Sequence, residues 1–234
     1  MLTDLIDVTE GVITPDICQQ IIRRFEASPH KKVGEVGSGV DRSMKDSRDI
    51  TISRYPEWQD VEEHLNTAMM GCLCAYLRKY PHALTASLAI GTRDPKSGVT
   101  KMLRPEDLQG LSDEALIPFV RYAFRPGMIN VQGYRADEGG YPYWHCEQYP
   151  KAKDTQCEAL HRVLLWSVYL NEEFEAGETE FLFQQRLVKP KTGAMILAPA
   201  SFSHTHRGNK PTGGDKYIAT SWVLFRRSED LFPA

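Results

Sequence analysis

The sequence predicts an α+β fold in which helices come first and a run of short strands follows. Before about residue 127, two segments carry apolar residues at every third or fourth position, as on one face of a helix. After Pro126-Gly127, short runs rich in β-branched and aromatic residues alternate with turn residues, which is typical of strands. Helices followed by such strands favour a helical layer that covers one face of an antiparallel sheet or barrel.

The N-terminal part begins with an expected strand over residues 5–8, followed by a helix. Thr14-Pro15-Asp16 offers an N-cap hydroxyl, a proline at the first helical position and an acid in the first turn. Ser28-Pro29 ends this helix, because the residue before a proline disfavours the helical conformation. Residues 34–49 are polar and rich in glycine and serine, so we expect a mobile loop there, although Asp41-Arg42 and Arg48-Asp49 could pin it.

The longest expected helix runs from about residue 57 to residue 79 and supports the sheet. Its apolar stripe has spacings of three or four residues and consists of Trp58, Val61, Leu65, Met69, Cys72 and Tyr76. Residues 92–110 contain repeated proline and glycine breakers and are predicted to form a loop. The segment from Ser112 to Leu116 is predicted to form one or two helical turns before Pro118.

Strands are expected along most of the chain after Gly127. They cover residues 128–134, 163–170, 181–188, 194–197 and 216–225. Because neither a repeat nor a linker divides the chain, we expect a single domain over residues 1–234. Within it, residues 1–127 would form a helical support region with the opening strand, and residues 128–225 would form the β core.

The composition indicates an ordinary globular protein, with 41% hydrophobic and 25% charged residues in 234. A formal net charge of −3 without a long Lys/Arg run argues against a nucleic-acid partner. The apolar runs are too short to span a membrane, and the acids near the N-terminus argue against a signal peptide. Five cysteines without close paired spacing fit reduced thiols, so we expect a cytoplasmic location. The sequence leaves the oligomeric state open.

A candidate metal site comes from two distant segments of the β-rich part. His145 and Glu147 are two residues apart, so on a strand they share a face, and Cys146 points to the opposite face. A second imidazole follows much later, in the segment 203–208, which contains both His204 and His206. Two histidines and one carboxylate form the facial triad of a non-haem Fe(II) oxygenase, which leaves coordination positions open.

A candidate anion site follows on the last expected strand. Period two places Lys216, Ile218, Thr220 and Trp222 on one face. A lysine on a mostly apolar face is costly unless its amine meets an anion, and a ligand carboxylate would stabilise it.

Taken together, these motifs resemble the Fe(II)/2-oxoglutarate-dependent dioxygenases, specifically the prolyl 4-hydroxylase-like group. The segments that carry the resemblance are Tyr134, Gly139-Gly140, His145-Cys146-Glu147, Tyr169-Leu170-Asn171, Gly177-Glu178-Thr179 and Pro190-Lys191-Thr192-Gly193. The spacing of three later residues also matches, with Lys216 ten residues after His206 and Trp222 six residues after Lys216. The resemblance covers about 100 residues, from Met128 to Phe225.

The resemblance implies a double-stranded β-helix, or jelly-roll, core backed by the N-terminal helices. By analogy, the iron ligands would be His145, Glu147 and His206, and the 2-oxoglutarate site would include Lys216, Tyr134 and Trp222. Lys216 would pair with the far carboxylate of 2-oxoglutarate, Tyr134 would hydrogen-bond it, and Trp222 would form a wall of the pocket. The implied cofactor set is Fe(II) and the cosubstrate 2-oxoglutarate, with ascorbate as an optional addition.

The implied reaction uses dioxygen to hydroxylate an unactivated C–H bond while 2-oxoglutarate is converted to succinate and carbon dioxide. A prolyl residue in a peptide or protein is the leading substrate, and a small molecule is the next. The polar segments 34–49 and 151–158 are candidate lids over the site.

Several positions depart from the family pattern or leave alternatives open. Glu147 stands where the family has Asp, so its longer side chain puts the metal geometry in question. Leu165 stands where relatives often have a Thr that helps to hold 2-oxoglutarate. The segment between Tyr134 and the first metal ligand is about two residues longer than usual, so Tyr141 or Tyr143 could replace Tyr134.

Two further side chains near the site are weaker candidates. His204 would share the strand face of His206, and the spacing to Lys216 favours His206 as the ligand. Arg162 could guide an acidic substrate.

Two other functions compete with the oxygenase. One is a non-catalytic jelly-roll binding module whose metal site is degenerate because of Glu147. The other is a zinc hydrolase that uses the same ligands, although Lys216 argues against it because a hydrolase does not need to hold a dicarboxylate.

Overall fold

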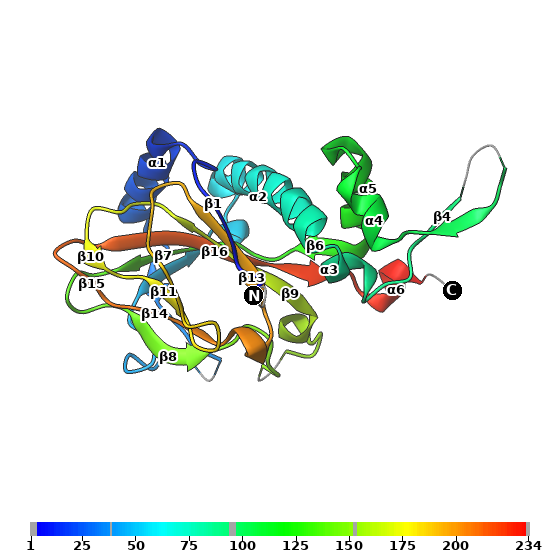
Figure 1. The fold of residues 1–234 in the computed structure, drawn as a ribbon. Coiled ribbons are helices and arrows are strands. Elements are labelled where there is room, and N and C mark those ends of the chain that lie inside the picture. The colour runs from blue at the N-terminus through cyan, green and yellow to red at the C-terminus, as the bar shows by residue number, and fades with distance from the viewer. Residues whose placement is uncertain (1–3, 38, 94–96, 152–153, 233–234) are drawn as a thin grey trace.

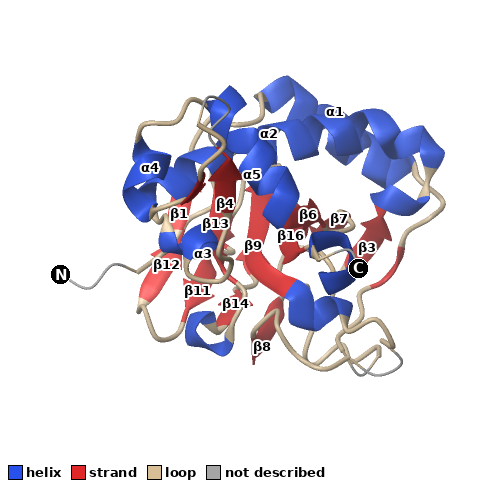
Figure 2. Ribbon diagram, turned by 90° about the vertical axis from the view of Figure 1, so that its right-hand side faces the viewer, coloured by secondary structure: helices blue, strands red, loops and turns tan. Residues whose placement is uncertain are grey.

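The computed structural model describes residues 4–37, 39–93, 97–151 and 154–232. Two antiparallel sheets face each other, and helices cover the outer face of the larger sheet (Figure 1). Figure 2 shows the same helical layer along one side of the strands. This is the predicted α+β arrangement, with a jelly-roll core backed by N-terminal helices.

The larger sheet has eight strands, and residues from both ends of the chain meet in it. Its strands, in spatial order, are β1 (Asp7–Thr9), β13 (Met195–Pro199), β9 (Arg162–Tyr169), β16 (Lys216–Phe225), β7 (Asn130–Tyr134), β3 (Arg48–Thr51) and β2 (Lys32–Val33), with β6 (Phe124–Pro126) paired to β16. β16 has the predicted bounds, and it is the central strand because it pairs with β6, β7 and β9.

Alternation along β16 separates the two sides of this sheet. Tyr217, Ala219 and Val223 belong to the large core cluster shared with the helices, whereas Ile218 and Trp222 pack in the smaller cluster on the opposite face. The smaller cluster lies toward the second sheet, where the cavity described below is found.

The smaller sheet contains the strands that carry the histidines. Its order is β12 (Arg186–Val188), β11 (Thr179–Phe181), β14 (His206–Gly208) and β8 (Tyr141–His145), and a separate ribbon pairs β10 (Glu175–Ala176) with β15 (Pro211–Thr212). The prediction of one strand over residues 181–188 is wrong, because β11 and β12 form a hairpin. In the turn of this hairpin, Gln185 adopts a positive φ of 48°. The turn was not predicted because its sequence contains neither glycine nor proline.

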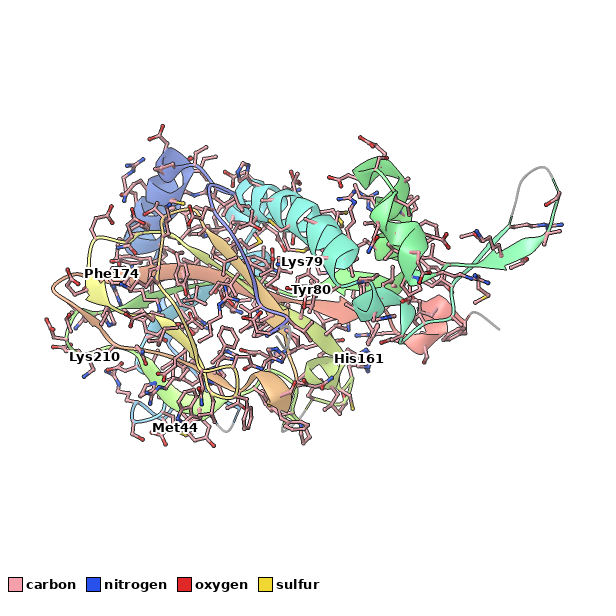
Figure 3. All side chains as sticks on the ribbon, viewed as in Figure 1. Met44, Lys79, Tyr80, His161, Phe174 and Lys210 are labelled. Carbon is pink, nitrogen blue, oxygen red and sulfur yellow. The ribbon has the colours of Figure 1, made fainter. Side chains whose placement is uncertain are left out.

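Three long helices form most of the outer layer. They are α1 (Pro15–Ala27), α2 (Gln59–Lys79) and α5 (Asp113–Ala123). Two short turns, η1 (Ile52–Arg54) and η2 (Pro56–Trp58), precede α2. Figure 3 labels Lys79, the last residue of α2, and Tyr80, which follows it. The two long helices predicted in the N-terminal half are therefore present.

In the region before the β core, prolines and glycines led to wrong predictions of where helices and strands end. Pro118 lies inside α5 rather than beyond a short helix, because Leu116 and Val120 on its two sides are buried against the core. The predicted loop over residues 92–110 contains β4 (Gly91–Arg93), β5 (Thr100–Met102) and α4 (Pro105–Gln109), while residues 94–96 lie outside the described part. The β4–β5 hairpin projects from one end of the molecule (Figure 1).

The polar segment 34–49, predicted to be a mobile loop, is tied to the sheet at its end. Arg48 and Asp49 belong to β3, which pairs with β7, and Lys45 is 4% exposed. Residue 38 lies outside the described part. The remaining short elements are α3 (His82–Thr85), η3 (Glu158–His161), η4 (Phe202–His204) and α6 (Ser228–Leu231). Among the helices that the structure describes, none has the length and apolarity needed to cross a membrane.

Candidate active site

A cavity of about 340 Å³ lies between the two sheets. Its floor and walls come from β7, β9 and β16 of the larger sheet and from β8 and β14 of the smaller one. Both predicted sites, the metal ligands and the lysine, open into this single cavity.

The three predicted metal ligands come together at one end of the smaller sheet. His145 is the last residue of β8 and lies directly opposite His206, the first residue of β14. Oε1 of Glu147 is 3.6 Å from Nε2 of His145 and 3.5 Å from Nε2 of His206. Their ligand atoms lie within 4.8 Å of one another, which is the spacing of donors around one ion.

Glu147 reaches this position by a different route from the one predicted. β8 ends at His145, so a shared strand face does not place the carboxylate. Instead, the amides of Glu147 and Gln148 both donate to the carbonyl of Ala200, at 3.0 and 3.1 Å. This anchor turns the chain after the strand and brings the longer side chain within reach of both imidazoles.

Backbone carbonyls fix the orientation of the two imidazoles. Nδ1 of His145 is 2.9 Å from the carbonyl of Tyr143, and Nδ1 of His206 is 2.9 Å from the carbonyl of His204. A carbonyl only accepts hydrogen bonds, so each Nδ1 carries the proton. In both rings Nε2 is therefore the nitrogen that faces Glu147, and it is the one that has a lone pair for a metal in the neutral tautomer.

The second oxygen of Glu147 is held on the opposite side. Nε1 of Trp222 donates to Oε2 at 2.9 Å, and the Arg162 guanidinium donates to the same oxygen at 3.2 Å and to the Glu147 carbonyl at 2.9 Å. The guanidinium also stacks on the Trp222 ring, 3.5 Å from its centroid. These contacts leave Oε1 as the oxygen that faces the histidines.

The protonation states at this centre suit a cation. Burial opposes the ionisation of Glu147, but the adjacent imidazoles of His145 and His206 outweigh it and hold its pKa well below the usual range. Burial, with a further contribution from His206, lowers the pKa of His145. An ionised carboxylate and a neutral imidazole are the forms that bind a metal, so this donor set fits Fe(II).

Lys216 lies deep in the same cavity and is 3% exposed. Its Nζ donates to the carbonyl of Gly177 at 2.7 Å and lies near the rings of Tyr134 and Tyr169, at 5.7 and 5.6 Å from their centroids. Burial lowers its pKa to about 8, although the charge of Glu178 opposes this shift. Within the described part of the chain it forms no salt bridge, so a buried amine is left to meet an anion.

Position 177 requires glycine because two side chains pack closely against its backbone. Its φ is +73°, and an added Cβ would lie 2.7 Å from the ring of Phe174 and 3.5 Å from Cδ of Lys216. Phe174 lies at the end of the molecule where β10 and β15 pair (Figure 3). Glycine therefore allows the carbonyl of residue 177 to reach the lysine amine.

Comparison with known proteins decides the family likeness. Residues 129–224 match the 2OG-Fe(II) oxygenase superfamily. The matched segment is the β core of the chain, so the chain resembles these oxygenases there, as the sequence motifs predicted. Fe(II) and 2-oxoglutarate are the pair that names the superfamily, and the donor set and buried lysine described above suit both.

The similar proteins include prolyl hydroxylases. A provisionally named prolyl 4-hydroxylase of Acanthamoeba polyphaga mimivirus is 35% identical over 74 residues, which are 28% of this chain and 31% of that protein. The chain thus spans less than a third of the length of this curated relative. A Trichoplax adhaerens prolyl hydroxylase, solved with a peptide fragment of the hypoxia inducible factor oxygen degradation domain, superposes with a TM-score of 0.63 at 12% identity, covering 98% of this chain and 86% of that one.

A second solved structure has the same fold. The viral collagen prolyl hydroxylase of Paramecium Bursaria Chlorella virus-1, in its 2OG complex, gives a TM-score of 0.55 at 15% identity, over 94% of this chain and 95% of that one. At these identities the two superpositions show a common fold, and they confirm the predicted jelly-roll core.

The tyrosines near the oxygenase-like site differ in what they contact. The Tyr134 hydroxyl donates to Oε1 of Gln132 at 2.7 Å, and Nε2 of Gln132 is 3.4 Å from Asp49. Tyr141 stacks on His145 with ring centroids 3.8 Å apart. Tyr143 is 50% exposed and contributes its carbonyl rather than its ring. Tyr134 and Tyr141 line the cavity, so of the three only Tyr143 is placed away from it.

His204 is buried but does not belong to the ligand set. It lies in η4 rather than on a strand, so the prediction that it shares a strand face with His206 is wrong. Its Nε2 contacts the carbonyl of Asp4 at 2.9 Å, and its Nδ1 contacts the hydroxyl of Ser203 at 3.0 Å. The residue ties the N-terminal segment to the smaller sheet.

Sequence reasoning missed several polar groups of the cavity. Arg162 was expected to guide an acidic substrate, but the structure joins it to Glu147. Lys45 bonds Asp49 at 2.6 Å and lies 5.5 Å from the ring centroid of Tyr141. Arg162 is fifteen residues from Glu147, and Lys45 is only four residues from Asp49 but contacts Tyr141 from a distant segment. None of these segments has a regular period that would have predicted the contacts. Leu165, at the position where relatives often have Thr, lines the cavity with its apolar side chain.

Proposed function

We propose that the chain is an Fe(II)- and 2-oxoglutarate-dependent dioxygenase that acts as a single domain. In this proposal His145, Glu147 and His206 hold the iron, and Lys216 binds the far carboxylate of 2-oxoglutarate. The observation that carries it is that one cavity contains both three donor atoms within 4.8 Å of one another and a buried lysine without a salt bridge among the described residues.

When bound together with dioxygen, the iron and the cosubstrate supply the oxidising power for hydroxylation of an unactivated C–H bond. The chain's own contribution is binding, orientation and shielding. The Nδ1 hydrogen bonds of the histidines keep both Nε2 atoms aimed at the centre, and Trp222 and Arg162 keep one carboxylate oxygen turned toward it. The apolar walls formed by Leu165, Ile196 and Ile218 limit the access of water.

The proposed substrate is a prolyl residue in a peptide or protein. The prolyl hydroxylases among the similar proteins support this choice, and a small-molecule substrate is the alternative. The proposed lids are the segments 34–49 and 151–158, parts of which border the cavity. Gly37 and Tyr149 lie so close that a Cβ on Gly37 would be 2.8 Å from the Tyr149 ring. Residues 38, 152 and 153 of these segments lie outside the described part.

The proposal is tested by succinate formation from 2-oxoglutarate in the presence of Fe(II), dioxygen and a proline-containing peptide. His145→Ala and His206→Ala should each abolish succinate formation. His64→Ala, on the exposed face of α2, is the matched control and should retain it. Succinate formation that survives both ligand changes refutes the assignment, and metal binding without 2-oxoglutarate consumption favours a non-catalytic binding module.

A further inference from the structure

The mouth of the cavity carries basic side chains that have no acidic partner. Lys32, Arg54 and Lys151 line the cavity and are solvent-exposed. None of the three forms a salt bridge within the described residues, whereas fifteen other lysines and arginines of the same part of the chain do so at distances up to 4.0 Å. Their charges are therefore not neutralised by the protein itself.

The charges that line the whole cavity are unbalanced. Its cationic residues are Lys32, Lys45, Arg54, Lys151, Arg162 and Lys216, and its acidic residues are Glu35, Asp49 and Glu147. Two opposite-charge pairs account for four of them, since Lys45 bonds Asp49 at 2.6 Å and Arg162 bonds Glu147 at 3.2 Å.

Once these pairs are set aside, the cations exceed the acids at the mouth. The proposed function assigns Lys216 to the cosubstrate, so Glu35 alone opposes Lys32, Arg54 and Lys151. The chain as a whole has a formal net charge of −3, so the local excess of positive charge runs against its overall composition. A cleft with an excess of one charge attracts ligands of the opposite charge.

The shape of the mouth suits an extended chain. Lys32 belongs to β2, which is the edge strand of the larger sheet, so one side of its backbone is not used by the sheet. Val33, Tyr55 and Met128 also line the cavity beside the cations and offer apolar contact area. An edge strand, apolar side chains and cations are together the features with which proteins bind extended peptides.

We propose that the cavity mouth selects an acidic peptide, in which Asp or Glu residues flank the residue that enters the cavity. The inference rests on the proposed function, because it assigns the deep part of the cavity to iron and 2-oxoglutarate. The three exposed cations act on substrate affinity and on substrate choice, and they do not touch the reacting atoms. Exposed charge pairs are individually weak and are screened by salt, so the preference depends on ionic strength.

The test uses three peptides that share one proline-containing core and differ only in flanking Asp, Asn or Lys residues. Binding to the full chain loaded with Mn(II) and 2-oxoglutarate is followed by fluorescence anisotropy. At low salt the Asp peptide should bind about fivefold tighter than the Asn peptide, and the Lys peptide should bind weakest. Half-molar salt should remove most of the difference.

Charge-reversed variants show whether the cavity mouth is responsible. The triple variant Lys32→Glu, Arg54→Glu and Lys151→Glu should reverse the order of the Asp and Lys peptides, and the corresponding triple Gln variant should abolish the preference. Lys189→Glu is the matched control, because this exposed lysine follows β12, at the other edge of the smaller sheet from β8. It should keep the preference for the Asp peptide.

Three results overturn the inference. They are equal or absent binding of all three peptides, an unchanged preference in the triple variants, and displacement of the Asp peptide by free aspartate at the same concentration as by the peptide itself. The last result would mean a small-molecule acid instead of a peptide.

Succinate formation with Fe(II), dioxygen and each of the three peptides, measured on the same wild-type preparation, separates this inference from the proposed function. If 2-oxoglutarate is consumed and no acidic preference is found, only the inference about the mouth fails. If 2-oxoglutarate is never consumed, the proposed function fails, while the peptide preference is still decided by the binding data.

Discussion

The contact between Arg162 and Glu147 should control how tightly the centre binds its metal. Arg162→Gln removes the hydrogen bonds of the guanidinium to Oε2 and to the carbonyl of Glu147, and it removes the stacking on Trp222. The side chains of Arg162 and Glu147 are only 11% and 16% exposed, so water replaces these contacts poorly.

The magnitude follows from what remains after the change. The indole of Trp222 still donates to Oε2 at 2.9 Å, so the carboxylate keeps one of its two side-chain partners. Loss of a group that orients a metal ligand weakens metal binding by about 10- to 100-fold, which is roughly 1.4 to 2.7 kcal/mol. Arg162→Lys keeps the charge but cannot reach both oxygens of residue 147, and it should lie between the wild type and Arg162→Gln.

The assay is calorimetric titration with Mn(II), which needs neither dioxygen nor turnover. The chain offers a matched control in Arg207, which bonds Glu180 at 2.8 Å and stacks 4.4 Å from the centroid of Trp144, outside the cavity-lining set. Arg207→Gln loses the same kind of contact and should leave the Kd for Mn(II) within about twofold of wild type. Equal weakening in both variants, or no weakening in Arg162→Gln, refutes the proposed role of Arg162.

Two further predictions concern a buried charge and the backbone. With Mn(II) present, the Kd for 2-oxoglutarate should be constant below pH 8 and rise about tenfold per pH unit above it, because the dicarboxylate binds the protonated amine of Lys216, whose pKa is lowered to about 8. Lys216→Arg stays charged and should flatten this dependence, and an equally steep rise in that variant would assign it to another group. Gly193→Ala should lower the free energy of unfolding by about 1 to 3 kcal/mol or more, since φ is +77° and the new Cβ would clash with the carbonyl of Ile13. Gly71→Ala, with open space on the surface of α2, should instead raise it by roughly 0.5 to 1 kcal/mol, as denaturant titration of both variants would show.

Lys216 should also make the free energy of unfolding depend on pH. The pKa of Lys216 is about 8 in the folded chain, whereas a freely solvated lysine, as in the unfolded chain, has a pKa of 10.5. Between these two pH values the unfolded chain therefore binds more protons. Stability therefore rises with pH across this window. Lys216→Met should remove this contribution, which denaturant titrations at pH 7.5 and pH 10 would measure.

Strong local patterns predicted much of the fold. The helix expected from about residue 57 to 79 is found as η2 and α2, and the expected strand over residues 216–225 is β16. Both segments have a periodic apolar face that agrees with the way they are buried. The convergence of His145, Glu147 and His206 was also predicted, because residue types and spacing at a metal site are themselves a pattern.

The features that were missed depend on tertiary packing and pairing more than on local sequence pattern. The turn between β11 and β12 is held by hydrogen bonds from the Leu182 amide to the Thr205 carbonyl and from Nε2 of Gln184 to the Ser203 carbonyl, both at 2.9 Å, and its sequence lacks turn residues. Pro118 stays helical because burial of α5 outweighs the lost hydrogen bond. The partners of Arg162 and Lys45 lie on other strands or beyond a turn, so the sequence could supply these side chains but not their pairing.

The proposed function requires that one iron and one 2-oxoglutarate bind side by side in the cavity. An anaerobic titration of Fe(II) into the protein with 2-oxoglutarate measures this through the visible charge-transfer absorption of an iron-chelated keto acid. We predict that the band saturates at one Fe(II) per chain in the wild type and is lost in His206→Ala and Glu147→Ala. A wild-type protein without the band, or a band of equal strength in both variants, would contradict the assignment.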